Sequence, residues 1–157
     1  MKLRRDDVIV AGVGNPFAGD DAVGVAIVEE LKNRGWLEGV AKICVETLGL
    51  KALDDLEGYR AIVFVDAADL GLEIGEWVFL QGREFEKRVS LFSHDVGIVD
   101  LMHALRLVSQ FQPLFYVFAV QGESYGFASQ MSSRIKQKLE HYAAELVKLV
   151  ESLLEDN

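Results

Sequence analysis

Three side chains that could bind a metal ion or activate water stand at the ends of predicted elements. Asp21 follows a glycine-rich turn after an apolar run, Asp66 ends another apolar run, and His94 precedes a helical pattern. In an open α/β sheet such positions converge on the crevice outside the carboxyl ends of the strands. Two carboxylates and an imidazole suit a divalent cation such as zinc or nickel, and three protein ligands leave a position open for substrate or water. We therefore predict that Asp21, Asp66 and His94 share one functional site.

Each of these residues also has a purely structural explanation. Asp21 could cap a helix, Asp66 could form a turn, and His94 could be a polar residue before a helix. For the neighbouring Asp20 we prefer the structural interpretation, because a carboxylate at a helix start satisfies free N–H groups and is favoured by the helix dipole. One cap is sufficient, which leaves Asp21 to face the crevice.

The elements that must position these residues alternate between strand and helix. Residues 8–11 form a continuous apolar run, which is typical of a strand covered on both faces. Further strands are predicted at residues 40–45, 61–65, 77–80 and 115–120, and helices at 21–33, 51–56, 98–108 and after about 130. The strand at 77–80 follows its predecessor too closely for a crossover helix, so we expect it to be antiparallel.

The order of elements predicts one three-layer α/β/α domain that spans residues 1–157, with a mostly parallel sheet. Residues 82–89 are charged and show no strong period, which favours a solvated loop, with a partner-binding surface as the alternative.

Composition excludes several classes of function. The formal net charge is −9 and the sequence pI is near 4.8, which argues against an electrostatic grip on nucleic acid or anionic lipid. The amino end does not read as a signal peptide, and no apolar run is long enough to span a bilayer. The single cysteine, Cys44, permits no internal disulfide and fits a reducing cytoplasm. We interpret Cys44 as a small buried hydrophobe.

Two local motifs suggest other activities and are incomplete. Gly12-Val13-Gly14 begins like a dinucleotide fingerprint, but Phe17 occupies the place of the third glycine. Residues 122–126 match the G-x-S-x-G elbow of serine hydrolases, yet helical periodicity resumes only after about residue 129. The available histidine, His141, lies in a regular helix and cannot return to Ser124. A serine hydrolase that uses Ser124 is therefore a minor alternative, and His103 and His141 are predicted to be surface or edge residues.

Three separate segments, in this order, resemble the hydrogenase maturation proteases, which trim the C-terminal extension from the large subunit of nickel–iron hydrogenases. They are Gly12-Val13-Gly14-Asn15 with Gly19-Asp20-Asp21 and Gly24; Val65-Asp66-Ala67 with Gly71 and Gly75; and Ser93-His94-Asp95-Val96-Gly97. The resemblance implies a five-stranded twisted sheet flanked by helices.

The same resemblance implies a metal-binding and catalytic triad of Asp21, Asp66 and His94. It also implies that nickel already present in the large-subunit precursor is the recognition signal, so that the resting enzyme need not hold a metal of its own. Either the metal or an aspartate could activate the water. A non-catalytic module that binds the precursor in a metal-dependent way is the alternative from a different class.

Overall fold

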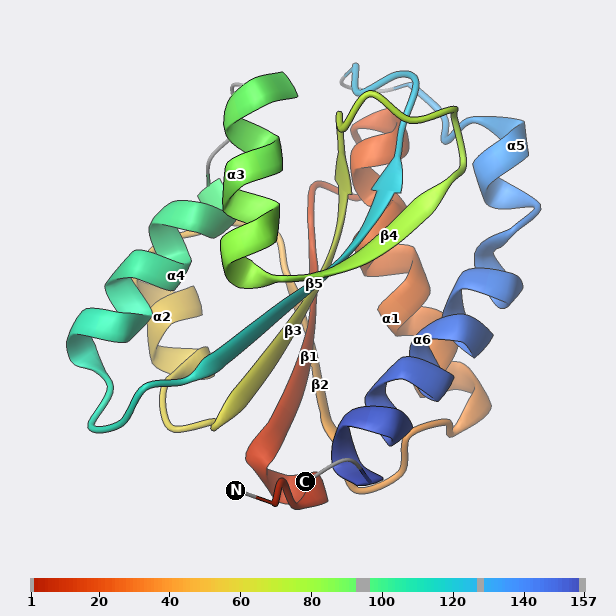
Figure 1. The fold of residues 1–157 in the computed structure, drawn as a ribbon. Helices are drawn as coiled ribbons and strands as arrows, with labels where there is room; N and C mark the ends of the chain where they lie inside the picture. The colour runs from red at the N-terminus through yellow and green to blue at the C-terminus, as the bar shows by residue number, and fades with distance from the viewer. Residues whose placement is uncertain (1, 93–96, 127–128, 156–157) are drawn as a thin grey trace.

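A central five-stranded sheet organises the protein. The computed structural model describes residues 2–92, 97–126 and 129–155. The strand order is β2-β1-β3-β5-β4, and helices lie on both sides of the sheet (Figure 1). The strands are β1 (Val8–Val13), β2 (Ala41–Val45), β3 (Ala61–Ala68), β4 (Trp77–Gln81) and β5 (Leu114–Gln121). Four run parallel, and β4 pairs antiparallel with β5, which confirms the predicted fold class and the direction of the fourth strand.

The helices form the two outer layers. One side of the sheet carries α1 (Val23–Arg34), α5 (Ser133–Lys136) and α6 (Leu139–Glu155) (Figure 1). The other side carries α2 (Leu50–Leu56), α3 (Gly82–Phe92) and α4 (Gly97–Val108). Successive side chains of a strand point to opposite faces, so Val8 and Val10 pack toward α1 and α6 while Ile9 and Ala11 pack toward α2 and α4. None of the helices that the structure describes has the length and apolar content needed to cross a membrane.

The expectation of a loop at residues 82–89 is wrong, because this stretch begins helix α3. Phe85 and Val89, four residues apart, are 3% and 1% exposed, and all three residues between them are charged. Residues at this spacing lie on one face of a helix, so Phe85 and Val89 pack together against the sheet. Gly82 allows the helix to start close to the sheet, since a Cβ there would lie 2.9 Å from the Cβ of Phe115.

Close packing of α1 against the strand ends fixes the place of the turn that bears Asp21. A Cβ on Gly24 would overlap the carbonyl oxygen of Val65, and one on Gly12 would lie 2.5 Å from the carbonyl oxygen of Gly24. Phe17, which occupies the place of the third glycine of the fingerprint, is 68% exposed. The glycine that allows α1 to approach the sheet is therefore Gly24, just beyond the incomplete fingerprint.

Candidate active site

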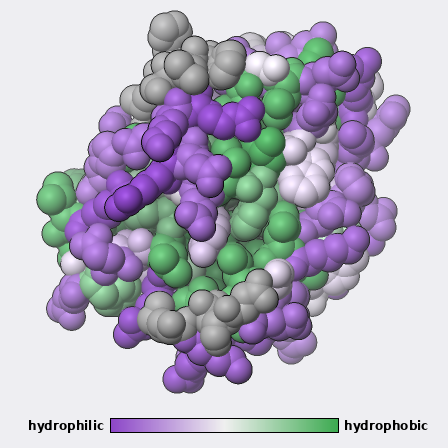
Figure 2. Space-filling model, in the orientation of Figure 1, coloured by the Kyte–Doolittle hydropathy of each residue, from purple (hydrophilic) through white to green (hydrophobic). Residues whose placement is uncertain are grey.

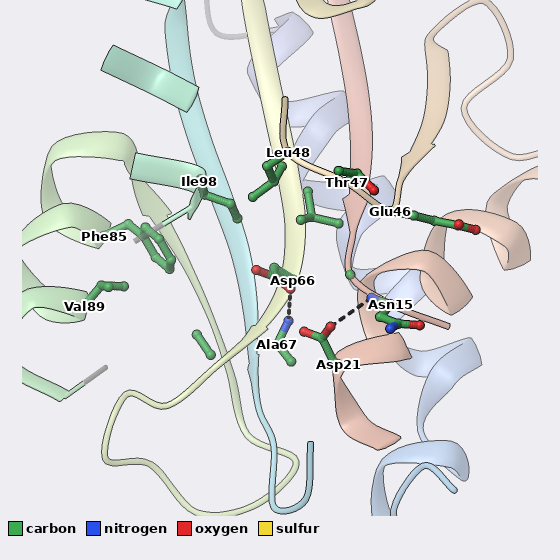
Figure 3. A pocket seen from close by; sticks show the side chains of 13 residues that line it. Asn15, Asp21, Glu46, Thr47, Leu48, Asp66, Ala67, Phe85, Val89 and Ile98 are labelled. Carbon is green, nitrogen blue, oxygen red and sulfur yellow. Dashed lines mark hydrogen bonds between the residues drawn. The ribbon is translucent and has the colours of Figure 1, made fainter. Parts of the chain in front are cut away.

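A cavity of about 310 Å³ at the carboxyl edge of the sheet brings Asp21 and Asp66 together (Figure 3). Figure 3 shows their carboxylates pointing toward one another from separate elements, the turn before α1 and strand β3. The convergence that the sequence predicted for these two aspartates is therefore present. The cavity is lined by Val13, Gly14, Asn15, Asp21, Glu46, Thr47, Leu48, Asp66, Ala67, Ala68, Phe85, Val89 and Ile98.

Asp21 lies in a 3₁₀ turn, Gly19–Ala22, that leads into α1. The backbone N–H of Asn15 donates a hydrogen bond to Asp21 Oδ2 at 2.8 Å. Gly14 has a φ of 140° and a Cβ there would overlap the carbonyl oxygen of Asp21, so only glycine lets the chain pass this close. The carboxylate is partly exposed and faces the cavity, where it can accept a cation or a proton.

Asp66 is only 8% exposed and lies within β3, two residues before its end. The strand was predicted to end at Asp66, but Ala67 and Ala68 continue its pairing with β5. The backbone N–H of Ala67 donates to Asp66 Oδ1 at 2.8 Å. A carboxylate this deeply buried costs free energy unless hydrogen bonds, a cation or a proton stabilise it. Its position at the cavity wall therefore suits cation binding.

His94, the third predicted site residue, lies outside the described residues. Within residues 2–92, 97–126 and 129–155, no three His, Cys, Asp or Glu side chains come close enough together to hold a metal ion. The pair of aspartates is thus the part of the predicted triad whose position the structure describes.

Asp20 does not cap a helix, contrary to our expectation. Neither the 3₁₀ turn nor α1 has a side-chain hydrogen bond at its N-cap. Instead the fully buried carboxylate accepts bonds from Glu123 N (2.8 Å), Ser124 N (3.1 Å), Ser132 N (2.7 Å) and Ser132 Oγ (2.6 Å). In addition, the N–H of Asp20 donates to the carbonyl of Ser124 at 2.6 Å. We call this set of contacts the Asp20 clamp, and it ties the turn before α1 to the loop after β5.

The clamp also sets the protonation of Asp20. Burial by itself raises the pKa of the Asp20 carboxyl, but the hydrogen bonds from Ser132, Glu123 and Ser124 outweigh it and leave the pKa below its usual value of 3.8. Asp20 is therefore ionised at neutral pH. Sequence reasoning missed this role because the donors lie more than 100 positions further along the chain.

The elbow-like motif at residues 122–126 is explained by the clamp. Ser124 is held through its backbone N–H and carbonyl, both bonded to Asp20. His103 lies 3.0 Å from Glu86 on α3, and His141 is exposed on α6, so neither is arranged as the base of a serine nucleophile. Both histidines occupy the surface positions that the sequence predicted.

Other residues of the site were missed by sequence reasoning. Phe85, Val89 and Ile98 form an apolar wall of the cavity, and the loop expected at residues 82–89 excluded the first two from the predicted core. The spacing of four residues between Phe85 and Val89 is the sequence feature that could have indicated a helix.

Tyr125 lies near the same edge of the sheet. Burial, together with the charges of Asp69, Asp20 and Asp66, raises the pKa of its hydroxyl to about 12. It therefore stays protonated at neutral pH and remains a hydrogen-bond donor.

Cys44 behaves as expected for a packed, unreactive thiol. It is partly buried against the core on the α1 side, and its Sγ lies 3.3 Å from Glu29 Oε1. Burial and the bond to Glu29 raise the pKa of the thiol to about 11. A thiol that keeps its proton is a poor nucleophile, so Cys44 is not a candidate for catalysis.

Comparison of the fold with solved structures gives close matches. The hydrogenase maturating endopeptidase HybD from E. coli matches with a TM-score of 0.79 and 23% identity, covering 92% of each chain. The hydrogenase maturation protease HybD from Thermococcus kodakarensis matches with a TM-score of 0.75 and 19% identity, covering 94% of this chain and 99% of the other. These structures share the architecture of this chain.

Sequence comparison supplies the family. The hydrogenase 2 maturation protease of Escherichia coli (strain K12) is 29% identical over 149 residues, which cover 88% of this chain and 90% of the relative. A sequence model of the hydrogenase maturation protease family matches residues 25–149, the greater part of the chain. The match includes Asp66 and begins shortly after Asp21. The protein therefore belongs to the hydrogenase maturation protease family and is a peptidase.

Proposed function

We propose that this protein removes the C-terminal extension from the precursor of a nickel–iron hydrogenase large subunit. The observation that carries the proposal is the cavity in which Asp21 and Asp66 face one another, in a chain that belongs to this family. Its position at the carboxyl edge of a mostly parallel sheet is where α/β folds place their active sites.

Nickel enters this reaction as part of the substrate. Without a cation, two carboxylates that face each other repel, and a peptide gains little by entering between them. A precursor that already contains nickel offers that cation, and Asp21, Asp66 and His94 complete its coordination. The oxygen and nitrogen ligands suit nickel, and binding energy then aligns the nearby peptide bond. The site would thus act on large subunits that have received their metal.

Hydrolysis needs a polarised carbonyl and an activated water. The substrate's nickel can polarise the carbonyl and lower the pKa of a bound water. An aspartate that is not engaged by the metal can instead take the proton from water as a general base. The apolar wall opposite the aspartates, which includes Phe85, Val89 and Ile98, limits access of bulk water to the bond.

We also propose that the protein works in the cytoplasm. A chain with a single cysteine can form no internal disulfide, which fits a reducing compartment.

The direct test is to incubate the purified protein with the large-subunit precursor in nickel-loaded and nickel-free forms, and to follow the mass of the precursor. We expect loss of a C-terminal peptide from the loaded form alone. Equal cleavage of both forms would exclude nickel as the signal. Binding of the loaded precursor without any change in its mass would identify a binding module in place of the proposed protease.

His94→Ala tests the member of the triad that lies outside the described residues. Removal of the imidazole should abolish cleavage of the loaded precursor while the circular dichroism spectrum and thermal midpoint stay close to those of the wild type. His141→Ala, at an exposed position of α6, is the matched control and should process normally. Full processing by His94→Ala would exclude this histidine from the site.

A further inference from the structure

A second surface with a distinct chemistry lies on the outer side of α3 and α4. Arg83, Glu86, Lys87, His103 and Arg106 line a hollow of about 560 Å³ between these helices, and we call it the α3–α4 basic groove. Figure 2 shows strongly hydrophilic residues over α3 and α4 on this face. Cationic side chains outnumber the acidic one in this hollow, whereas the chain as a whole has a net charge of −9.

Two cationic side chains of the groove, Arg83 and Arg106, have no carboxylate partner among the described residues. Glu86 is engaged with His103, whose Nε2 lies 3.0 Å from Glu86 Oε1 and links the two helices. The guanidinium of Arg106 stacks over the ring of Phe115 at 5.1 Å. In the part of the chain that the structure describes, neither Arg83 nor Arg106 forms an ion pair with an aspartate or glutamate. Their charges remain available to a ligand.

Exposed apolar side chains lie close to Arg83 and Arg106. Arg83 and Arg106 also line an adjoining hollow of about 390 Å³ together with Leu114, which is 39% exposed. At the end of α4, Leu107 and Val108 are 86% and 44% exposed. A small inorganic anion needs no apolar neighbours, and nucleic acid needs a larger basic face. Arginine beside exposed apolar residues is the composition of a surface that binds protein.

Helix α3 connects this surface with the cleavage cavity. Its residues Phe85 and Val89 line the cavity, whereas Arg83 and Lys87 line the groove. The two sites therefore lie on different sides of one helix, a separation of about 10 Å. A folded protein with a segment in the cavity would cover the groove at the same time.

We propose that the α3–α4 basic groove is a docking surface for an acidic, partly apolar surface of the precursor protein. This inference rests on the proposed function, since the precursor is the protein that must approach the cavity. Complementary charge speeds the encounter of two proteins and orients them without taking part in bond cleavage. The groove then determines which folded proteins reach the active site, and the aspartates act only on those that have docked.

The test compares two double charge reversals that change the net charge equally. Arg83→Glu with Lys87→Glu alters the groove, whereas Lys32→Glu with Lys148→Glu alters exposed residues of α1 and α6 on the opposite side of the sheet. At low ionic strength the groove variant should raise KM for the loaded precursor about tenfold and leave kcat unchanged, while the control resembles the wild type. Added salt should raise the wild-type KM toward that of the groove variant.

A milder variant and a cleavage-independent measurement complete the test. Arg83→Gln with Lys87→Gln should also raise KM, by a smaller factor, and thermal midpoints verify that each variant folds.

In calorimetric titration, polyglutamate should bind the wild type and the control alike, and the groove variant at least about tenfold more weakly. Equal binding of polyglutamate by the wild type, the control and the groove variant overturns the proposal that the groove is a docking surface, whether or not the precursor is cut. The proposal is also overturned if the groove variant has the same KM as the control. It is overturned as well if the wild type sediments as a dimer and the groove variant as a monomer, because the groove would then be a contact between copies of this chain. Absence of cleavage by the wild type, with polyglutamate binding as expected, rejects the proposed function separately.

Discussion

Asp20 and Asp21 are neighbours in the chain and have opposite environments. The Asp20 carboxylate is fully buried and accepts bonds from three residues of the loop after β5, whereas Asp21 is partly exposed, accepts a bond from Asn15 N and lines the cavity. A 3₁₀ turn places successive side chains about 120° apart, so adjacent residues point in different directions. Two identical side chains thus acquire different roles from the hydrogen-bond donors around them.

The two environments also depend on each other. The Asp20 clamp fixes the turn from Gly19 to Ala22, and that turn carries Asp21 to the rim of the cavity. Because Asp20 has its hydrogen bonds satisfied within the protein, it stabilises the turn but offers nothing to a substrate. Asp21 can take part in chemistry because its surroundings leave part of its carboxylate exposed to the cavity.

We expect the largest effect on activity from substitution of an aspartate that lines the cavity. Asp21→Asn keeps the size of the side chain and an oxygen for the N–H of Asn15, but removes the charge that would bind the substrate's nickel. We expect kcat/KM for the loaded precursor to fall at least about a thousandfold. The urea unfolding midpoint should stay near that of the wild type. Asp66→Asn should behave in the same way, and processing above a tenth of the wild-type rate by either variant would separate that residue from catalysis.

Substitution of the other aspartate should act mainly on stability. Asp20→Ala leaves the partly buried N–H groups of Glu123, Ser124 and Ser132 without their acceptor. Such losses cost about 2–4 kcal/mol of unfolding free energy, which urea denaturation measures. Limited proteolysis should reveal faster cutting between residues 122 and 132. Unchanged stability would show that the Asp20 clamp does not hold the turn.

Some features of the fold and of the candidate site can be predicted from local sequence patterns, and others cannot. Continuous apolar runs identified β1 and β3, because strands covered on both faces need such residues along their whole length. Asp21 and Asp66 could be paired from sequence because carboxyl ends of parallel strands share one edge. The end of β3 was misplaced because Asp66 interrupts the apolar run although strand pairing continues to Ala68.

The remaining errors come from contacts between distant segments. The Asp20 clamp depends on Ser132, and no local pattern around Asp20 distinguishes a clamp from a helix cap. Helix α3 was not predicted because residues 82–89 are dominated by charge and contain two apolar residues, Phe85 and Val89, both of which are buried. Tertiary packing decides both cases, and it is encoded in residues too far apart to form a recognisable pattern.

The stability that the Asp20 clamp contributes should be lost in acid. The folded-state pKa of Asp20 is below its usual value of 3.8, so its ionised form contributes stability at higher pH, and this contribution is lost as the pH falls below 3.8 and through the folded pKa. Between pH 7 and pH 3, wild-type unfolding free energy should therefore fall more steeply than that of Asp20→Asn. Parallel curves in urea titrations at each pH would contradict this assignment.

Ser132→Ala offers a finer test of the same clamp. It removes the hydroxyl that donates to Asp20 Oδ2 at 2.6 Å but keeps the backbone N–H that donates to Oδ1. The loss of one hydrogen bond to a charged group should lower the unfolding free energy by about 1–2 kcal/mol, measured by urea denaturation. In a double-mutant cycle with Asp20→Ala, the effect of Ser132→Ala should largely vanish, whereas strict additivity would place the hydroxyl outside the clamp.

Ser124→Ala should have the smallest effect and completes the comparison. Ser124 reaches Asp20 through its backbone N–H and carbonyl, which alanine retains, and its side chain is exposed. Because no catalytic step depends on its hydroxyl, we expect kcat/KM within about twofold and unfolding free energy within about 0.5 kcal/mol of the wild type. Precursor cleavage and urea denaturation measure both. Loss of cleavage with unchanged stability would restore the serine-hydrolase alternative, since the only group removed would be a nucleophile. Paired with Ser132→Ala, the result separates a serine that contributes its hydroxyl to the Asp20 clamp from one that contributes only its backbone.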